Sequence, residues 1–340
     1  MYTLASLFTG CGGGDLGLKG GFTFMKKRYS RLPFSLVYAN EINEKIADIF
    51  NGNFSAEADV RDIRNVKDHE IPKHDVLVGG FPCVSFSIVA QNPKRLGIKN
   101  DESGMLFFEM CRILRDKQPK AFIAENVKGL LSANKGEAIS LIIDAFSKCG
   151  YKVKYEVLNA ADYGVPQNRY RVIIVGIRND IQSEFSFPEP THNQRGENNR
   201  KKHIPLGDII FSESEVDEKY FFSEKAVQGM LNAKKDMNKG RAQELDRPCN
   251  TVGAHLAKVS LNSTDPVLMI NGNYRRFTPR EVARIQSFPD SFQLVGSEGT
   301  QYRALGNAIP PVLMWQVAKE LAETLKRAEE CNEVALIKIS

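Results

Sequence analysis

Hydrophobic and polar positions follow two different periods along the first half of the chain. Short apolar runs predict strands over residues 2–8, 34–39, 76–78, 121–124, 153–158 and 172–177. Helical spacing of apolar residues predicts helices over residues 44–50, 105–115 and 138–149. Because strand and helix alternate, we expect an α/β fold with a mostly parallel sheet and helices on both faces.

The pattern changes near Phe187, where the segment FPEPTHNQRGENNRKKHIP is polar and rich in turn residues. Periodicity then stays weak until regular spacing returns with TPREVARIQSF, and residues 312–327 predict an amphipathic helix. We therefore expect a main domain made of residues 1–190 and 275–340. A smaller, irregular domain of residues 191–274 would interrupt it.

The composition is that of a globular protein, since 42% of the 340 residues are hydrophobic and 26% are charged. No apolar run approaches the roughly 18 residues of a membrane span, and the first residues do not resemble a signal peptide. We therefore expect no membrane partner and a cytoplasmic location. The net charge of +5 permits a nucleic-acid partner without arguing for one. Six scattered cysteines form no C-x-x-C pair, so we expect neither a metal site nor disulfides.

A glycine-rich turn, LFTGCGGGDLG, follows the first predicted strand. Glycines at such a position let the backbone turn tightly and approach a ligand at a helix N-terminus. The second predicted strand leads to Glu41, where an acidic residue would bind ribose hydroxyls, and Asp59 could end a third strand near an adenine ring. The glycine turn by itself fits NAD, FAD or S-adenosylmethionine, and a tight turn without a ligand is the alternative.

Two further motifs place reactive side chains after predicted strands. In VLVGGFPCVSFS, Cys83 follows a buried strand and a stiffening proline, at the edge where α/β sheets bind ligands. In FIAENVKGL, Glu125 and Asn126 follow another strand, so a carboxylate would lie near that thiol. The alternative interpretations are a buried core cysteine and a helix cap.

The segment DYGVPQNRYRV carries Gln167, Arg169 and Arg171 at alternating positions of a predicted strand. Alternation would place the two arginines on the same face, and a solvated, charged edge strand is the alternative. A last motif, YRALGNAIPP, places Gly306 and Asn307 immediately before the final predicted helix.

Taken in order, FTGCGGG, GFPC, ENV, QNRYRV, RPCNTV and GNAIP closely resemble the motifs of the DNA (cytosine-5) methyltransferases. The resemblance covers about residues 3–325, with a variable gap at about 190–240, and the prokaryotic restriction–modification type is nearest in size. It implies the Rossmann-like fold of S-adenosylmethionine-dependent methyltransferases, with S-adenosyl-L-methionine as cofactor and no metal. It also implies double-stranded DNA as substrate, a partner restriction endonuclease, a monomer and a bacterial cytoplasmic location.

The resemblance also implies roles for individual residues. Cys83 would be the covalent nucleophile, Glu125 would contact the cytosine ring, and Arg169 and Arg171 would hold the flipped base and its phosphate. The cofactor pocket would comprise Phe8, Gly10, Gly12, Gly13, Glu41, Ile42, Asp59, Val60, Pro82, Leu106 and Asn307. DNA contacts would come from Ser85, Ser87, Lys94, Arg95, Arg247 and Thr251. One departure is Val84, which stands where most members have Gln and leaves one contact of the following loop open.

A cytosine stacked in a duplex cannot reach Cys83, so it must be flipped out at a cost of about a few kcal/mol. We expect the polar loop of residues 85–104 to close over the flipped base, a passive surface loop being the alternative. Residues 191–274 are the expected reader of the DNA sequence. Their basic residues, suited to phosphate contact, form two clusters: Arg195, Arg200, Lys201 and Lys202, then Lys234, Lys235, Lys239 and Arg241.

Three other functions would keep part of this pattern. An RNA methyltransferase of the same fold, such as a tRNA enzyme, would keep every catalytic residue, so those residues do not discriminate. A nicotinamide-dependent oxidoreductase would explain only the glycine turn and would leave Cys83, Glu125 and Arg171 without a role. A non-catalytic DNA-binding relative would be expected to have lost these three side chains.

Overall fold

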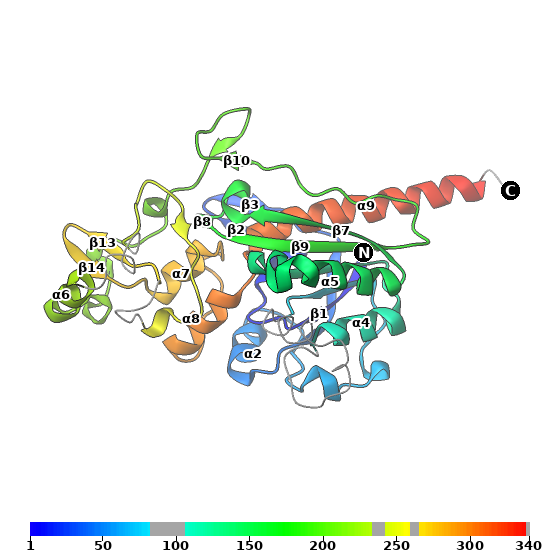
Figure 1. The fold of residues 1–340 in the computed structure, drawn as a ribbon, viewed down its shortest axis with the longest axis horizontal. Coiled ribbons are helices and arrows are strands. Elements are labelled where there is room, and N and C mark those ends of the chain that lie inside the picture. The colour runs from blue at the N-terminus through cyan, green and yellow to red at the C-terminus, as the bar shows by residue number, and fades with distance from the viewer. Residues whose placement is uncertain (82–105, 233–241, 259–264, 338–340) are drawn as a thin grey trace.

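The computed structural model describes residues 1–81, 106–232, 242–258 and 265–337. Its centre is a six-stranded sheet in the order β4-β1-β5-β6-β9-β7 (Figure 1). The strands are β1 (Tyr2–Leu7), β4 (Phe34–Asn40), β5 (Val76–Gly79), β6 (Ala121–Val127), β7 (Tyr151–Asn159) and β9 (Tyr170–Arg178). All six predicted strands are present, with ends that differ by a few residues from the apolar runs.

Four neighbouring strands of this sheet are parallel. β1 pairs with β4 and with β5, and β5 pairs with β6. β9 runs antiparallel to both β6 and β7. The connection from β7 to β9 is short, and a parallel pair would need a crossover of about a dozen residues or more. The sheet is therefore mostly parallel, as predicted, and its antiparallel strand β9 brings Arg171 opposite Val127 at the end of β6.

Helices cover both faces of the sheet (Figure 1). The α-helices of the described residues are α1 (Gly13–Lys19), α2 (Glu44–Asn51), α4 (Leu106–Lys117), α5 (Glu137–Lys148), α6 (Glu224–Asn232), α7 (Pro279–Ile285), α8 (Glu298–Asn307) and α9 (Pro311–Ile337). Val76 and Val78 pack with α1 and α9 on one face, and Leu77 packs with α4 and α5 on the other. Of the helices in the described residues, none is both long and apolar enough to span a membrane.

A hairpin that the hydrophobic pattern did not predict lies between α1 and β4. Its strands β2 (Phe22–Phe24) and β3 (Lys27–Tyr29) are antiparallel. The two residues of its turn, Met25 and Lys26, have φ angles of 44° and 62°. Two-residue turns of this left-handed kind are usually signalled by Asn-Gly or Asp-Gly, and Met-Lys carries no such signal.

Residues 191–274 form mostly short elements. The strands are β10 (His192–Asn193), β11 (Lys201–Lys202), β12 (Cys249–Asn250), β13 (Leu268–Ile270) and β14 (Asn273–Arg275), and β12 pairs with β8 (Gln167–Asn168). Leu206 and Val252 share one apolar cluster with Ile46 of α2 and Phe288 after α7. This region therefore shares a core with the rest of the chain, and the domain boundaries at 190 and 274 stay a prediction.

Candidate active site

The turn after β1 contains several left-handed residues. Phe8, Gly10 and Gly12 have φ angles of 55°, 60° and 86°. A Cβ on Gly10 would meet no atom within 4 Å, so a ligand can approach the backbone there. A Cβ on Gly12 would overlap an aromatic ring, and one on Gly13 would overlap the carbonyl oxygen of Ile309. Gly12 and Gly13 therefore allow close packing, whereas Gly10 leaves open space beside the turn.

Glu41 follows the end of β4 and is fixed against the glycine turn. Its carboxylate oxygens accept hydrogen bonds from the backbone N–H of Gly10 at 3.0 Å and from that of Asn43 at 2.8 Å. Burial raises the pKa of the Glu41 carboxyl, and these two donors partly offset the rise. The neighbouring Ile42 is 62% exposed. The structure thus brings Glu41 and Gly10 together, as the cofactor prediction required.

Asp59 extends the same edge of the sheet beyond β4. Its backbone N–H donates to the carbonyl of Ala39 at 2.8 Å. Its carboxylate accepts from the guanidinium of Arg61 at 2.8 Å and from the hydroxyl of Tyr38 at 3.1 Å, and the bond from Arg61 lowers the pKa of Asp59. Val60 beside it is 43% exposed. Asp59 and Val60 therefore lie beside the end of β4, next to Glu41. The sequence predicted that the adenine end of a cofactor would lie near Asp59.

Glu125 and Arg171 form an ion pair at the end of β6. The Arg171 Nε and Glu125 Oε1 atoms are 2.8 Å apart, and each side chain is 12% exposed. A Cβ on Gly80 would lie 3.4 Å from the other oxygen of Glu125. The Asn126 side chain donates to the carbonyl of Phe81 at 2.9 Å. The end of β6 therefore holds its carboxylate beside the chain that leads directly into Pro82-Cys83.

Several predicted site residues lie outside the described residues: Pro82, Cys83, Ser85, Ser87, Lys94 and Arg95. The rest of the predicted closing loop, residues 85–104, lies outside them as well. Leu106 is the first residue of α4 and is partly buried. The described residues nearest in the chain to the predicted nucleophile Cys83 are therefore Phe81 before it and Leu106 after it.

Arg169 does not share a face with Arg171, and that prediction was wrong. Its side chain is 1% exposed, and its guanidinium donates to the backbone carbonyls of Val252, Gly306 and Ala308 at 2.9–3.1 Å. Burial lowers the pKa of Arg169 to about 9, with the positive charge of Arg171 adding to the effect. Alternation fails because Arg169 lies between β8 and β9, outside the strand that contains Arg171. Arg169 thus ties its own segment to Val252 and to residues 306–308, and its role at the site stays a prediction.

Two buried glutamines add further hydrogen bonds between the backbone segments around Arg169. Gln167 donates to the side chain of Gln286 at 2.8 Å and accepts from the backbone N–H of Val252 at 2.9 Å. Gln286 donates in turn to the carbonyl of Leu305. Both glutamines are fully buried. Sequence reasoning missed Gln286, whose only signal is an amide beside the apolar residues of the stretch ARIQSF.

The end of α8 lies beside the glycine turn. Asn307 is exposed, and two residues later the carbonyl of Ile309 lies against Gly13. The charge of Arg303 partly offsets the raised pKa of Glu41. Arg303 was not predicted, although its spacing of four residues from Asn307 places both on one face of a helix.

The two predicted DNA contacts after β11 lie at the surface. Thr251 donates from its hydroxyl to the carbonyl of Asn168 at 2.7 Å. Arg247 pairs with Glu244 at 2.9 Å, and both side chains are about three-fifths exposed. Pairing with an exposed carboxylate leaves Arg247 available for exchange with a phosphate.

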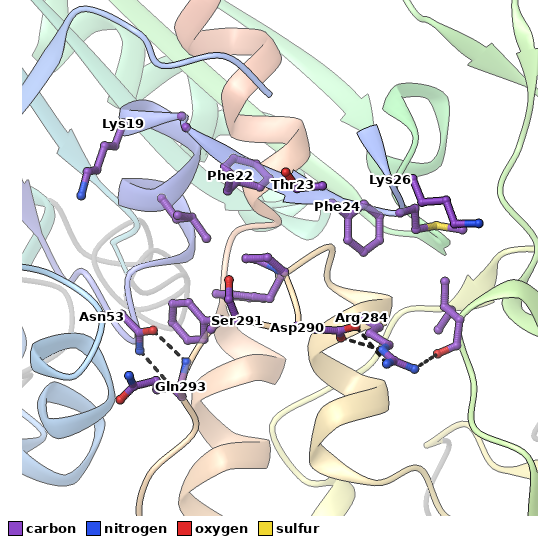
Figure 2. A pocket seen from close by; sticks show the side chains of 18 of the residues that line it. Lys19, Phe22, Thr23, Phe24, Lys26, Asn53, Arg284, Asp290, Ser291 and Gln293 are labelled. Atoms are coloured by element: carbon purple, nitrogen blue, oxygen red, sulfur yellow. Dashed lines mark hydrogen bonds and ion pairs between the residues drawn. The ribbon is translucent and has the colours of Figure 1, made fainter. Parts of the chain in front are cut away.

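A separate cavity of about 1140 Å³ lies between the β2–β3 hairpin, the end of α1 and residues 284–293. Figure 2 shows Lys19 and Lys26 on the hairpin side and Asn53 and Gln293 at the opposite side. Of the predicted site residues within the described part of the chain, none lines it. Nowhere in that part are three or more His, Cys, Asp or Glu side chains grouped so that they could hold a metal ion.

The sheet, the glycine turn after β1 and the acidic residues after the next strand define a class of protein, the S-adenosylmethionine-dependent methyltransferase fold. The model of one family, C-5 cytosine-specific DNA methylase, matches residues 2–323. The chain therefore belongs to the C-5 cytosine-specific DNA methylase family and is a DNA (cytosine-5) methyltransferase.

Curated relatives agree with this assignment, and a solved structure shares the fold. The chain is 36% identical to the Type II methyltransferase M.NgoFVII of Neisseria gonorrhoeae, over 94% of this chain and 86% of that protein. It is also 36% identical to the Type II methyltransferase M.FnuDI of Fusobacterium nucleatum, over 97% of each. The crystal structure of the S. pombe Dnmt2 methyltransferase has the same fold, with a TM-score of 0.73 and 20% identity over 96% of this chain and 99% of that one.

Proposed function

We propose that this enzyme methylates carbon 5 of one cytosine in a specific double-stranded DNA sequence, with S-adenosyl-L-methionine as methyl donor and Cys83 as nucleophile. The observation that carries the proposal is the Glu125–Arg171 pair at the end of β6, with 2.8 Å between Nε and Oε1. Glu125 adjoins Gly80, three residues before Cys83. An acid, a guanidinium and a thiol are the groups that addition to a cytosine ring requires.

The cofactor would lie across the carboxyl ends of β1 and β4. Gly10 leaves open space beside its backbone, and Glu41, fixed by two N–H donors, would accept hydrogen bonds from ribose hydroxyls. Asp59 and Val60 would flank the adenine. The pocket would be completed by Phe8, Gly12, Gly13, Ile42, Pro82, Leu106 and Asn307. S-adenosyl-L-methionine supplies a methyl group on a positively charged sulfur, which is activated for transfer.

Carbon 5 of cytosine is a poor nucleophile, and the side chains of the site would change that. The Cys83 thiolate adds to carbon 6 while Glu125 gives a proton to ring nitrogen 3, which converts the ring into an enamine. Arg171 stabilises the charge that develops on the exocyclic oxygen of the cytosine. The electron pair of the enamine forms the bond from carbon 5 to the methyl group, while the bond from that methyl group to sulfur breaks and leaves S-adenosyl-L-homocysteine. A base then removes the carbon 5 proton, the double bond forms again, nitrogen 3 returns its proton and Cys83 leaves.

The buried position of Arg169 supports a positioning role in this reaction. Its bonds to the carbonyls of Gly306 and Ala308 hold the residues on either side of Asn307. Its bond to Val252 holds the residue that follows Thr251. Arg169 would therefore set the cofactor side and the DNA side of the site relative to each other, without touching the base.

DNA would be held from both sides of the flipped cytosine. Residues 191–274 would read the sequence, with Arg247 and Thr251 at the surface of this region. The loop of residues 85–104 would close over the flipped base, which excludes water from the reacting atoms. Its proposed DNA contacts are Ser85, Ser87, Lys94 and Arg95.

The printed names of the relatives M.NgoFVII and M.FnuDI describe Type II methyltransferases. We therefore propose that the chain works in a bacterial cytoplasm as the protecting half of a restriction–modification pair. A restriction endonuclease would cut the same DNA site when it lacks the methyl group. The methyltransferase would act as a monomer, since each site needs only one copy of the catalytic residues.

The test is bisulfite sequencing of genomic-scale DNA after incubation with the purified protein and S-adenosyl-L-methionine. Cytosines protected within one short motif would support the enzyme, the methylated position and the sequence specificity together. Cytosines left unprotected on DNA, with methyl transfer to tRNA under the same conditions, would replace the DNA proposal by an RNA one.

Two variants test the roles of the side chains in that assay. Cys83→Ser should bind cofactor and DNA and transfer no methyl group, because a hydroxyl does not add to carbon 6 at a useful rate. Glu125→Gln should lower the rate by a factor of about 10² to 10⁴ with binding largely kept, because the amide cannot give a proton. Turnover by Cys83→Ser would contradict the nucleophile assignment, and a near-normal rate of Glu125→Gln would contradict the acid assignment.

A further inference from the structure

Asp59 and Arg61 form a bidentate pair at the edge of the predicted cofactor pocket. The Arg61 Nε donates to Asp59 Oδ1 at 3.0 Å, and the Arg61 Nη2 donates to Asp59 Oδ2 at 2.8 Å. The backbone N–H of Arg61 also donates to Oδ1, at 3.0 Å. Two parallel bonds from a planar guanidinium fix the orientation of a carboxylate, which a single bond would leave free to rotate.

A second side chain contacts this carboxylate from the central sheet. The hydroxyl of Tyr38, on β4, donates to Asp59 Oδ2 at 3.1 Å. The bond from Arg61 is the main cause of the lowered pKa of Asp59, so this carboxyl stays ionised at neutral pH. The Asp59 side chain is 16% exposed, so a ligand can reach it. The carboxylate is therefore charged, oriented and accessible.

Arg61 is itself anchored on its other side. Its Nη1 donates to Glu70 Oε1 at 2.6 Å, and the second oxygen of Glu70 accepts from the backbone N–H of Lys67 at 2.8 Å. The guanidinium of Arg112, on α4, donates to the carbonyl of Val66 at 3.1 Å. Arg61 therefore connects the oriented carboxylate to a segment that is fixed on α4.

The backbone of Asp59 is bonded to the ribose side of the predicted pocket. Its carbonyl accepts from the backbone N–H of Glu41 at 3.0 Å and from the side-chain amide of Asn40 at 2.9 Å. Asn40 also donates to the carbonyl of Arg61 at 2.8 Å, and Glu41 is fixed against Gly10. One continuous set of bonds thus holds both sides of the pocket. The Arg61 side chain is 49% exposed, so its replacement should leave the fold intact.

We propose that Arg61 is a positioning residue for the cofactor, which holds the Asp59 carboxylate so that it accepts a hydrogen bond from the exocyclic amino group of adenine. The proposal rests on S-adenosyl-L-methionine as the cofactor of the proposed function. An oriented, ionised acceptor favours a ligand with a donor at that place and disfavours one without it, because the carboxylate then loses solvent and gains no partner. Arg61 would thus set the preference for adenine by acting through Asp59.

The chain offers a matched pair three residues further on. Asp62 and Arg64 have the same order and spacing, and Asp62 Oδ1 accepts from the backbone N–H of Arg64 at 2.9 Å and from its Nε at 3.0 Å. The Asp62 side chain is 16% exposed, as that of Asp59 is. Asp62 caps the short 3-10 helix η1 (Ile63–Asn65) and is not among the predicted cofactor contacts. Arg64→Met therefore removes an equivalent pair outside the proposed adenine contact.

The experiment uses calorimetry to measure the binding of two ligands to the unaltered protein and to Arg61→Met, Arg61→Lys and Arg64→Met. One ligand is S-adenosyl-L-homocysteine, and the other is S-inosyl-L-homocysteine, whose purine carries a carbonyl oxygen in place of the amino group. In Arg61→Met, the Kd for the adenosyl ligand should rise about three- to tenfold, with a much smaller change for the inosyl ligand. Arg61→Lys should give an intermediate Kd, because it keeps the charge without the paired bonds. Arg64→Met should keep both Kd values.

Methyl transfer gives a second readout. The KM for S-adenosyl-L-methionine should rise in Arg61→Met by about the same factor with kcat unchanged, because the adenine contact is equally strong before and during the reaction. Unchanged Kd values in Arg61→Met, equal losses for the two ligands, or the same loss in Arg64→Met would overturn the proposal. Failure of the unaltered protein to bind S-adenosyl-L-homocysteine would instead count against the proposed function, so the two failures are distinguishable.

Discussion

Arg169 and Arg171 lie two residues apart in the chain, yet they belong to two different regions of the molecule. Arg171 reaches the carboxyl edge of the sheet, where its partner is the side chain of Glu125 and both remain partly exposed. Arg169 points into the junction between the sheet and residues 191–274, where its partners are three backbone carbonyls and almost no surface is exposed. One arginine is placed to meet a substrate, and the other is placed to hold the protein together.

The difference shows why a motif does not assign one role to all its polar residues. At the sheet edge, charges are paired side chain to side chain and can exchange partners with a ligand. At the junction, Arg169, Gln167 and Gln286 satisfy backbone groups that would otherwise be buried without partners. Mutations in the first region should therefore change activity, and mutations in the second should change stability.

The largest effect is expected at the junction, from the Arg275–Glu281 pair. Both side chains are fully buried, and the Glu281 carboxylate also accepts from the backbone N–H of Thr278 and of Phe211. Glu281→Leu should lower the free energy of unfolding by about 3–5 kcal/mol, because it leaves the Arg275 charge buried without its partner. Urea unfolding measures this, and a loss below about 1 kcal/mol would contradict the role given to the pair.

A matched pair of variants then tests the comparison itself. Arg169→Met should lower the free energy of unfolding by about 3 kcal/mol, because three buried carbonyls lose their donor. Arg171→Met should cost less, about 1–2 kcal/mol, because it leaves the mostly buried Glu125 carboxylate without its partner but with some access to solvent. The rate of methyl transfer should fall by a factor of about 10² to 10³ in Arg171→Met. Unfolding curves and single-turnover rates on both proteins measure the two effects. A larger loss of stability in Arg171→Met than in Arg169→Met would refute the division of roles.

The smallest effect concerns pH and tests the surroundings of His192 of β10, which pairs with Lys201 of β11. His192 has a folded pKa of about 4, below its ordinary value near 6.5, because of burial and the charges of Lys27 and Lys201. Between these values the unfolded chain binds a proton that the folded protein excludes. Stability from this group is therefore present above about pH 6.5 and is lost as the pH falls toward 4.

The variant His192→Gln should remove that loss. Between pH 8 and pH 5, the unaltered protein should lose about 1–2 kcal/mol more than this variant in urea unfolding. K27Q/K201Q should reduce the loss in part, because it removes two of the charges that oppose protonation. The other charged groups around the imidazole, His203 and Asp162, stay the same in both proteins. Identical pH dependence in all three proteins would contradict this account.

Regular hydrophobic periods made most of the fold predictable. The six sheet strands and the helices at 44–50, 105–115 and 138–149 follow from spacing alone, because each buries one face or one stripe of apolar side chains. The β2–β3 hairpin and α8 were missed, since the hairpin turn lacks Gly or Asn and the apolar stripe of α8 is weak. Short elements in residues 191–274 were missed for the same reason, as they bury too few residues to show a period.

The candidate site residues were predictable where they lie at the ends of strands. Glu41 follows β4 directly and Glu125 lies near the end of β6, and the carboxyl ends of parallel strands meet at one edge of the sheet. The third strand expected to end at Asp59 is only an isolated bridge between Asp59 and Asn40. Arg303 and Gln286 were not predicted, because a single polar residue in a helix or an apolar stretch gives no hint of which distant segment it will face.

The sequence by itself determined the order of strands and helices, the family and the residues that can do chemistry, because these depend on local spacing and on motifs. Only the tertiary structure decided that Arg169 is buried, that Gln167 and Gln286 join four segments, and that Arg171 pairs with Glu125. Each of these contacts is between residues that are far apart in the chain. The distance between such residues in space is set by how the sheet, the helices and residues 191–274 pack together, which no local pattern records.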